Sequence, residues 1–447
     1  MNLYFKSTKS FLKCLGIDQS IFWSVTNKAF GIFRAPVTLY FLVQFLTLEE
    51  QGLWYTFLSL AALSMLADLG FTSIITQFVS HEFANLKFNK GYIEGPLDKV
   101  DRLMALIEFS FKFYLKIIII SFFLLTVVGF LYFKTSEYSI HGAWMLFSLI
   151  GAFSLFISLF QAIFQGLDKM KEIQINILFN SLFVTFFTCF ALYFQLKIWS
   201  LIIGSVFGTI LTAFGLFRIG KQFWIQIFHY KIRGEYQFFK ETFPLQIKYA
   251  ASFIASYFIS YLYIPATFKY VGHIEAGQLG LTLSIITVIN SISNSWLFTR
   301  VPKFNIFVSR GKYNELDQIF KKSIFQGFFI QILLSVLFVI SISIINCYFP
   351  AFSNRLLKIH FVILLLFPQV AIFLISGLTL YLRAFKKEPL VWLQIINAIL
   401  LILAIFFILT KGMGIEYFLY SINFIYWIII FPLVIFKFIE ERKLLIV

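Results

Sequence analysis

The side chains best able to do chemistry are charged residues placed inside long apolar segments. Arg34 and Lys28 lie in the first such segment, Asp68 lies in the second, and Lys248 lies one turn inside the seventh. An ionisable group is costly within a bilayer and is usually functional there, so these residues form a candidate site. Cations predominate among them, which favours an anionic ligand such as a diphosphate. A buried structural pair for Arg34 and snorkelling of Lys248 to the headgroups are the alternatives.

Neutral polar residues in the same apolar segments are candidate partners for sugar hydroxyls. The candidates for this cavity lining are Asn27, Tyr257, Asn290 and Asn294. Hydrogen bonding between helices is the alternative for each of them. Proline and glycine can bend a helix, so we expect hinges at Pro36, Pro265 and Gly70.

Signatures of enzymes and metal sites are missing from the sequence. It contains neither G-x-x-x-x-G-K-[ST] nor H-E-x-x-H, and its five histidines are scattered. Glu49 and Glu50 resemble the acidic pair of membrane glycosyltransferases, but the loop around them is too short to hold an acceptor. We interpret them as acids in the first turn of a helix, where the macrodipole favours them. The sequence therefore predicts no catalytic residue, no metal and no cofactor.

The elements that position these residues are membrane-spanning helices. The chain has 447 residues, of which 60% are hydrophobic and 13% charged, and its mean hydropathy is +0.86. A soluble domain is about 45–50% apolar and about 25% charged, so a water-soluble fold is excluded. The apolar runs do not alternate with polar residues, which favours helices over barrel strands. Twelve segments qualify as spans: 20–46, 51–79, 108–133, 142–166, 173–195, 198–219, 244–268, 277–304, 323–347, 358–382, 389–410 and 415–436.

The basic residues predict which way the chain is inserted. Lys and Arg number 24 on the side of the N-terminus and 6 on the other side. By the positive-inside rule, both termini are cytoplasmic. Most of the net charge of +16 then reflects topology, so we expect no nucleic-acid partner. Residues 1–19 are expected to form a cytoplasmic amphipathic segment, either as a helix on the inner leaflet or as a frayed tail.

The two halves of the chain resemble each other. Glu50-Gln-Gly52 opens the second span and Glu275-Ala-Gly277 opens the eighth. These matches, with others in the same order, predict two six-helix bundles, 20–222 and 223–447. Six spans per half imply a pseudo-two-fold axis along the membrane normal, as in transporters that bind substrate between their halves. Chance similarity between Phe- and Ile-rich helices is the alternative.

Three short motifs carry a family resemblance: Leu46 to Tyr55, Leu66 to Phe71, and Val79-Ser80. They resemble the polysaccharide-export, or O-antigen flippase, family of the multidrug/oligosaccharidyl-lipid/polysaccharide (MOP) transporter superfamily. Glu275-Ala-Gly277, Pro302 and the loop around Gln165 are similar to further family positions.

The resemblance implies a cationic central cavity lined by helices 1, 2, 7 and 8. It implies a flippase that moves polyprenyl-diphosphate-linked oligosaccharide across the bacterial inner membrane by alternating access, for lipopolysaccharide or similar polysaccharide biosynthesis. Membrane lipids and other polysaccharide-assembly membrane proteins are the implied partners. An ion gradient, of H⁺ or Na⁺, is the implied energy source, and Asp68 and Glu108 are the obvious titratable carriers.

Two other functions remain open from the sequence. A drug or ion antiporter of the same fold would need an acidic cavity, whereas the charges here are mostly basic. A membrane enzyme acting on lipid-linked glycans would need a large outer loop with catalytic groups, and the outer loops are short.

Overall fold

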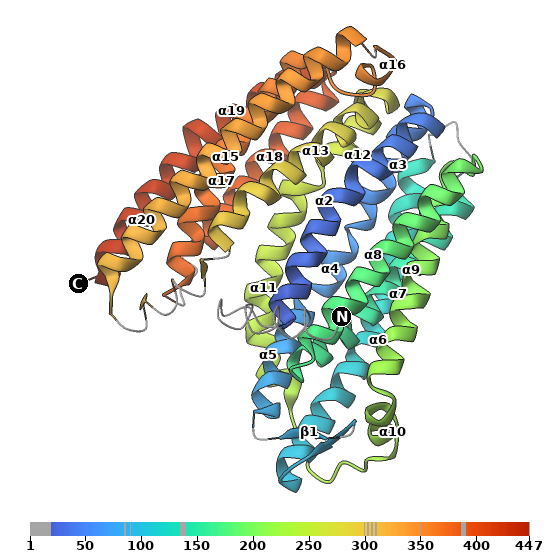
Figure 1. The fold of residues 1–447 in the computed structure, drawn as a ribbon, viewed down its shortest axis with the longest axis vertical. Coiled ribbons are helices and arrows are strands. Elements are labelled where there is room, and N and C mark those ends of the chain that lie inside the picture. Colours follow the sequence, from blue (N-terminus) through green and yellow to red (C-terminus); the bar gives the residue numbers. More distant parts are fainter. Residues whose placement is uncertain are drawn as a thin grey trace, which may run out of the picture. The chain divides into compact units, whose positions relative to one another are not determined.

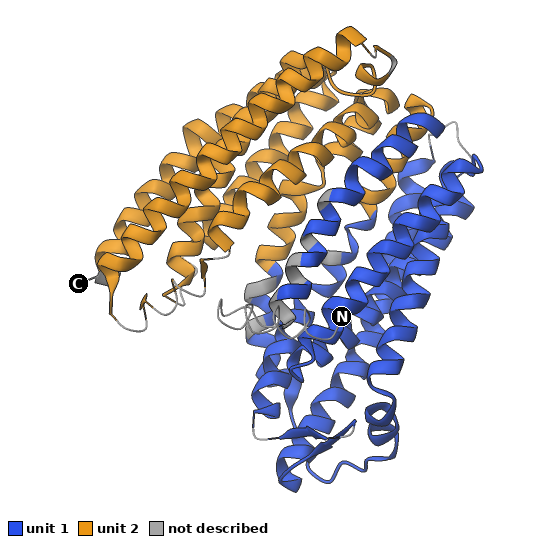
Figure 2. Ribbon diagram, in the orientation of Figure 1, with its two compact units in different colours: residues 1–46, 61–250 blue, residues 47–60, 251–447 orange. Residues whose placement is uncertain are grey.

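The computed structural model is all helical apart from one short hairpin, within the residues that it describes (Figure 1). These are residues 19–84, 86–89, 91–134, 140–298, 300–301, 304, 307–308, 311–348, 350–385 and 390–446. The expected amphipathic segment 1–19 lies outside the described residues, except for Gln19, where the first helix begins. The chain divides into two compact units, residues 1–46 with 61–250 and residues 47–60 with 251–447 (Figure 2).

Unit 1 consists of helices and one short β-hairpin. Its helices are α2 (Gln19–Phe45), α4 (Ser64–Asp68), α5 (Phe71–Phe83), α6 (Leu97–Phe133), α7 (His141–Gly166), α8 (Met170–Tyr193), α9 (Trp199–Ile219), α10 (Lys221–His229) and the first part of α11 (Phe238–Ser260). The antiparallel hairpin of β1 (Lys87–Asn89) and β2 (Tyr92–Glu94) pairs Phe88 with Ile93.

Unit 2 contains one helix from the first half of the sequence. This helix is α3 (Leu48–Ala61), and it joins the last part of α11 with helices from the second half. The others are α12 (Tyr263–Tyr270), α13 (His273–Phe298), α15 (Tyr313–Tyr348), α16 (Pro350–Ser353), α17 (Ile359–Arg383), α18 (Val391–Thr410), α19 (Gly414–Phe424), the π-helix η1 (Ile425–Ile430) and α20 (Phe431–Ile446).

The described helices account for nine to eleven candidate membrane spans. Nine are long and apolar enough by themselves, and two pairs of helices bent by 45° bring the number to eleven. The apolar part of α2, residues 29–45, falls short of the usual length of about 20 residues. The chain is therefore a multi-span membrane protein, as the composition predicts.

The two bent pairs lie close to two of the expected hinges. Leu69 and Gly70 separate α4 from α5 with positive φ angles of 47° and 77°, a conformation that glycine adopts without strain. The second break separates α11 from α12, and Pro265 is the third residue of α12. Pro36 lies inside α2, which continues to Phe45. Hinge motion at these positions stays a prediction.

The first turns of α6 hold the segment that joins α10 to α11. Asp101 is 5% exposed, and its carboxylate accepts hydrogen bonds from the backbone N–H groups of Arg233 and Gly234, both at 2.9 Å. The hydroxyl of Tyr236 donates to the same carboxylate at 3.1 Å. Burial and the hydrogen bond to Asp101 raise the pKa of Tyr236. This cluster, the Asp101 clamp, fixes the connection between the last two helices of unit 1.

Candidate functional site

Asp68 lies at the break between α4 and α5 and is 6% exposed. The hydroxyl of Tyr114, on α6, donates a hydrogen bond to its carboxylate. Thr72 donates from its hydroxyl at 2.9 Å and from its backbone N–H at 3.3 Å. These donors are neutral groups of unit 1, and Tyr114 itself is 0% exposed. An ionisable side chain buried within a membrane span is a candidate functional group.

The second expected titratable carrier has a different environment. Glu108 is on α6, and its carboxylate lies 2.5 Å from the ammonium of Lys112, one turn further along the helix. Both side chains are exposed to a large extent, at 45% and 72%. This arrangement is an ordinary pair on a helix surface, so Asp68 is the stronger candidate for coupling.

The other charged candidates also belong to unit 1. Arg34 and Lys28 are on α2, and Lys248 is on the part of α11 within this unit. Arg34 is exposed on the surface of α2. The side chains of Lys28 and Lys248 lie outside the described residues, so the expected Lys28–Asp68 pair stays a prediction.

Asn27 forms hydrogen bonds within unit 1. Its Nδ2 donates to the backbone oxygen of Gln174 at 2.7 Å and to Oε1 of the same residue at 2.8 Å. These bonds join α2 to α8, which agrees with the interhelical alternative for this residue.

Asn290 and Asn294 belong to an amide network in unit 2. Nδ2 of Asn290 donates to Oε1 of Gln369 on α17 at 2.8 Å, and its Oδ1 accepts from Nε2 of Gln331 on α15 at 2.9 Å. Nδ2 of Asn294 donates to the backbone oxygen of Asn290 at 2.9 Å. The network ties α13 to α15 and α17.

The remaining polar candidate, Tyr257 on α11, is buried, with 2% of its surface exposed.

The two repeated E-x-G motifs meet where α3 crosses α13 in unit 2. A Cβ on Gly52 would lie 1.9 Å from the backbone oxygen of His273, and one on Gly277 would lie 2.7 Å from the backbone nitrogen of Gly52. Gln51 is 1% exposed and donates to the backbone oxygens of Gly277 at 2.9 Å and Arg355 at 3.2 Å. The glycines of this motif therefore serve a close helix crossing, the α3–α13 crossing.

The two acids of the first motif lie at the N-terminus of α3. Glu50 accepts a hydrogen bond from the backbone N–H of Thr47 at 2.9 Å, and the hydroxyl of Thr47 accepts one from the N–H of Glu50 at 3.2 Å. This reciprocal pair is a capping box. Glu49 also lies in the first turn. The interpretation of both acids as residues of a helix N-terminus is confirmed.

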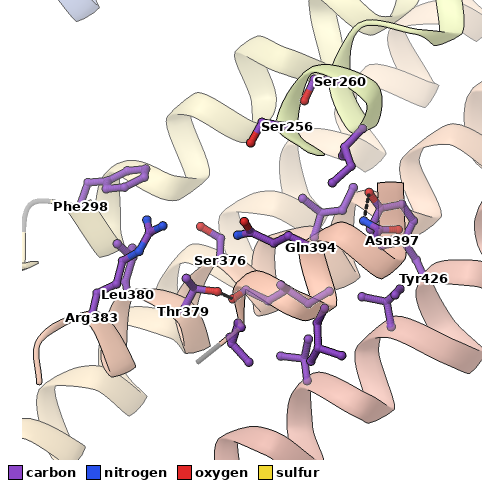
Figure 3. A pocket seen from close by; sticks show the side chains of 17 residues that line it. Ser256, Ser260, Phe298, Ser376, Thr379, Leu380, Arg383, Gln394, Asn397 and Tyr426 are labelled. Atoms are coloured by element: carbon purple, nitrogen blue, oxygen red, sulfur yellow. Dashed lines mark hydrogen bonds between the residues drawn. The ribbon is translucent and has the colours of Figure 1, made fainter. Parts of the chain in front are cut away.

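Sequence reasoning missed a cavity of about 260 Å³ inside unit 2, which is lined by apolar side chains together with several polar ones (Figure 3). Ser376, Thr379 and Arg383 line it from one face of α17, and Gln394 and Asn397 line it from α18. The spacing of three or four residues on each helix was visible in the sequence. It was not informative there, because the facing helices that complete the cavity could not be identified.

Comparison with solved structures identifies the fold. The lipid II flippase MurJ in an inward closed conformation is similar with a TM-score of 0.63 and 13% identity, covering 94% of this chain and 87% of that one. An inward-facing multidrug resistance MATE family transporter of the MOP superfamily gives 0.56 and 11%, covering 92% and 96%. The MATE multidrug transporter DinF-BH gives 0.51 and 13%, covering 93% of each. The fold is that of MOP-superfamily transporters.

The family follows from the sequence itself. Residues 18–305 match the family described as "Polysaccharide biosynthesis protein", and the chain belongs to that family. No curated protein matches the chain. Family and fold together confirm the resemblance drawn from the motifs.

Proposed function

We propose that this protein is a flippase that moves a polyprenyl-diphosphate-linked oligosaccharide from the inner to the outer leaflet of the bacterial inner membrane. Membership of the polysaccharide biosynthesis family is the observation that carries the proposal. The basic residues Arg34, Lys28 and Lys248 support it, because a diphosphate needs cations at membrane depth. All of them belong to unit 1, so this unit is proposed to bind the head of the lipid.

The proposed architecture has twelve spans with both termini in the cytoplasm. It adds α2 to the eleven candidate spans, and the repeat then groups the spans as 20–222 and 223–447 around a pseudo-two-fold axis. The basic residues of the loops support this orientation. Alternating access with the same orientation of both halves accounts for movement of the head group.

Asp68 is proposed to couple transport to a proton gradient. Its carboxylate contacts only hydroxyl and backbone donors among its described hydrogen-bond partners. A carboxylate in such surroundings changes its charge at little structural cost, since Tyr114 and Thr72 can reorient their hydroxyl hydrogens. The sequence also predicts a pair between Lys28 and Asp68, and this pair stays a prediction.

A leaflet assay tests the flippase. Purified protein is reconstituted into liposomes with a labelled polyprenyl-diphosphate oligosaccharide, and an impermeant glycosidase measures the glycan on the far leaflet. We expect Arg34→Ala to abolish translocation, because it removes the cation near mid-membrane. Arg218→Ala is the matched control, since Arg218 is an exposed arginine in the last turn of α9. Translocation by the Arg34 variant at the wild-type rate would contradict its role.

The drug antiporter is the second candidate, supported only by the likeness of fold to MATE transporters. Increased drug resistance on expression, without translocation of the lipid-linked glycan, would favour it. Resistance at the background level together with translocation would favour the flippase.

A further inference from the structure

An apolar groove on unit 1 has the size of a ligand site. Its cavity of about 790 Å³ is lined by residues of α6, α7, α9 and α10 and by the segment that follows α10. Ligand pockets commonly have volumes of about 300–1,000 Å³. Within this unit α7 packs against both α6 and α9, and α10 follows directly on α9 (Figure 1). The groove therefore lies on three helices that qualify as membrane spans.

The walls of the groove are aromatic and in part open to the surroundings. Phe111 of α6 contacts Phe160 of α7, with ring centroids 5.2 Å apart, and Trp224 of α10 meets Phe160 edge to face at 4.8 Å. The indole N–H of Trp224 donates to a backbone oxygen of α9 at 3.4 Å, so its polar atom has a partner within the protein. Phe153 and Phe217 also line the groove and are exposed. Because lipid surrounds spanning helices, these walls favour a hydrocarbon chain.

The charged residues of the lining lie at the depth of the lipid head groups. Among the described lining residues they are Glu108 and Lys112, both on α6. The helix continues for 21 residues beyond Lys112, to Phe133, which at 1.5 Å per residue is about 31 Å. Residues 117–133 include no charged side chain. The hydrocarbon core of a bilayer is about 30 Å thick, so Lys112 reaches one face of the core when Phe133 is at the other.

This pair presents both signs of charge beside the groove. The carboxylate of Glu108 and the ammonium of Lys112 are 2.5 Å apart, and their side chains are 45% and 72% exposed, so both can also contact a ligand. A phosphate accepts charge-assisted hydrogen bonds from Lys112, and an ammonium donates them to Glu108. An anionic head group that engages Lys112 would leave Glu108 without a counter-charge, whereas an ammonium on the same head group restores one.

We propose that this groove binds a phospholipid whose head group carries both a phosphate and a primary ammonium. The phosphate binds Lys112 and the ammonium binds Glu108. One hydrocarbon chain lies against Leu115 and Phe153, which line the part of the groove further along the spans. The bound lipid is a resident of unit 1 and not the transported molecule, so the inference goes beyond the proposed flippase and does not depend on it.

Native mass spectrometry of the full chain in detergent tests the choice of head group. Delipidated protein is titrated with phosphatidylethanolamine and with phosphatidylglycerol of identical acyl chains. Glu108→Gln removes the group that binds the ammonium. Glu315→Gln is the matched control, because Glu315 forms an ion pair with Lys312 at 2.7 Å, with side chains 47% and 49% exposed, and neither residue lines the groove.

A second pair of variants tests the groove itself. Ala213→Trp fills it from α9. Gly142→Trp on α7 is the control, because a Cβ at this position meets no described atom within 4 Å. Ala213→Leu replaces the first variant if that protein does not elute as a single species.

We expect the wild-type chain to bind phosphatidylethanolamine about fivefold more tightly than phosphatidylglycerol, the effect of one additional exposed ion pair. Glu108→Gln should reduce this preference to about twofold or less, and Glu315→Gln should keep it. Ala213→Trp should weaken the binding of both lipids about tenfold, the effect of displacing two methylene groups from the groove. Gly142→Trp should bind both lipids as the wild-type chain does.

Three results would overturn the proposal. Equal binding of the two lipids by the wild-type chain, or a preference that survives Glu108→Gln, would refute the head group. Unchanged binding after Ala213→Trp would refute the groove. Displacement of phosphatidylethanolamine by an equimolar polyprenyl phosphate would assign the groove to the transported lipid. Binding is measured here without transport, so this titration and the leaflet assay can fail separately.

Discussion

Replacing Gly52 with alanine should destabilise unit 2, although the position has no side chain that could be lost. The added Cβ would lie 1.9 Å from the backbone oxygen of His273 and 2.9 Å from its carbon. Both atoms belong to the main chain of α13, so no side-chain rotation can relieve the contact. The helices of the α3–α13 crossing must move apart, and the hydrogen bond from Gln51 to Gly277, now 2.9 Å, must lengthen.

The magnitude follows from two opposing effects. Overpacking a well-packed contact costs about 1–3 kcal/mol, and this contact with backbone belongs at the upper end of that range. Alanine in place of glycine inside a helix stabilises the helix by about 1 kcal/mol. The expected loss is therefore about 2 kcal/mol, which lowers the melting temperature of a unit of this size by about 4–8 °C.

Thermal unfolding in detergent, followed by the loss of the monodisperse peak in size-exclusion chromatography, measures this loss. Gly31→Ala is the matched control, because a Cβ at this helical position of α2 meets no described atom within 4 Å. It should melt at or slightly above the wild-type temperature. Gly280→Ala should also destabilise unit 2, since its Cβ would lie 2.5 Å from Cβ of Tyr55, an atom that side-chain rotation does not move. A Gly52 variant as stable as the Gly31 variant would refute the reasoning.

Two further predictions concern carboxylates of unit 1. Asp68→Asn should keep binding of the lipid-linked glycan but lose its response to a proton gradient in liposomes, because the amide cannot titrate; an unchanged response would exclude Asp68 as the carrier. Asp101→Asn should release the segment joining α10 to α11, since two N–H donors lose a charged acceptor worth about 1.5–3 kcal/mol for each bond. Tryptic cleavage after Arg233 should then rise several-fold, with the exposed Asp98→Asn as control, and equal cleavage of both variants would exclude the clamp.

The spans and their breaks follow from sequence because they depend on local properties. Long apolar runs specify helices in a bilayer, and Asp68-Leu-Gly70 marks a position where an apolar helix is interrupted. The structure places positive φ angles at Leu69 and Gly70. Family membership follows from the motifs for the same reason, since each motif is a short local pattern.

Tertiary partners do not follow in this way. Nothing local in the sequence of α3 assigns it to the unit formed by the second half of the chain. The crossing of Gly52 with Gly277 requires two segments more than two hundred residues apart to meet. Ser376 and Asn397 line one cavity only because α17 and α18 turn these faces toward each other and toward α11.

The hydrogen-bond partners of a polar residue show whether it holds helices together. Asn27 and Asn290 looked equivalent to any other asparagine in an apolar run, and both use their amides on neighbouring helices. Removing either would take a hydrogen bond from Gln174 or Gln331, so a loss of transport in such variants would not identify a substrate contact.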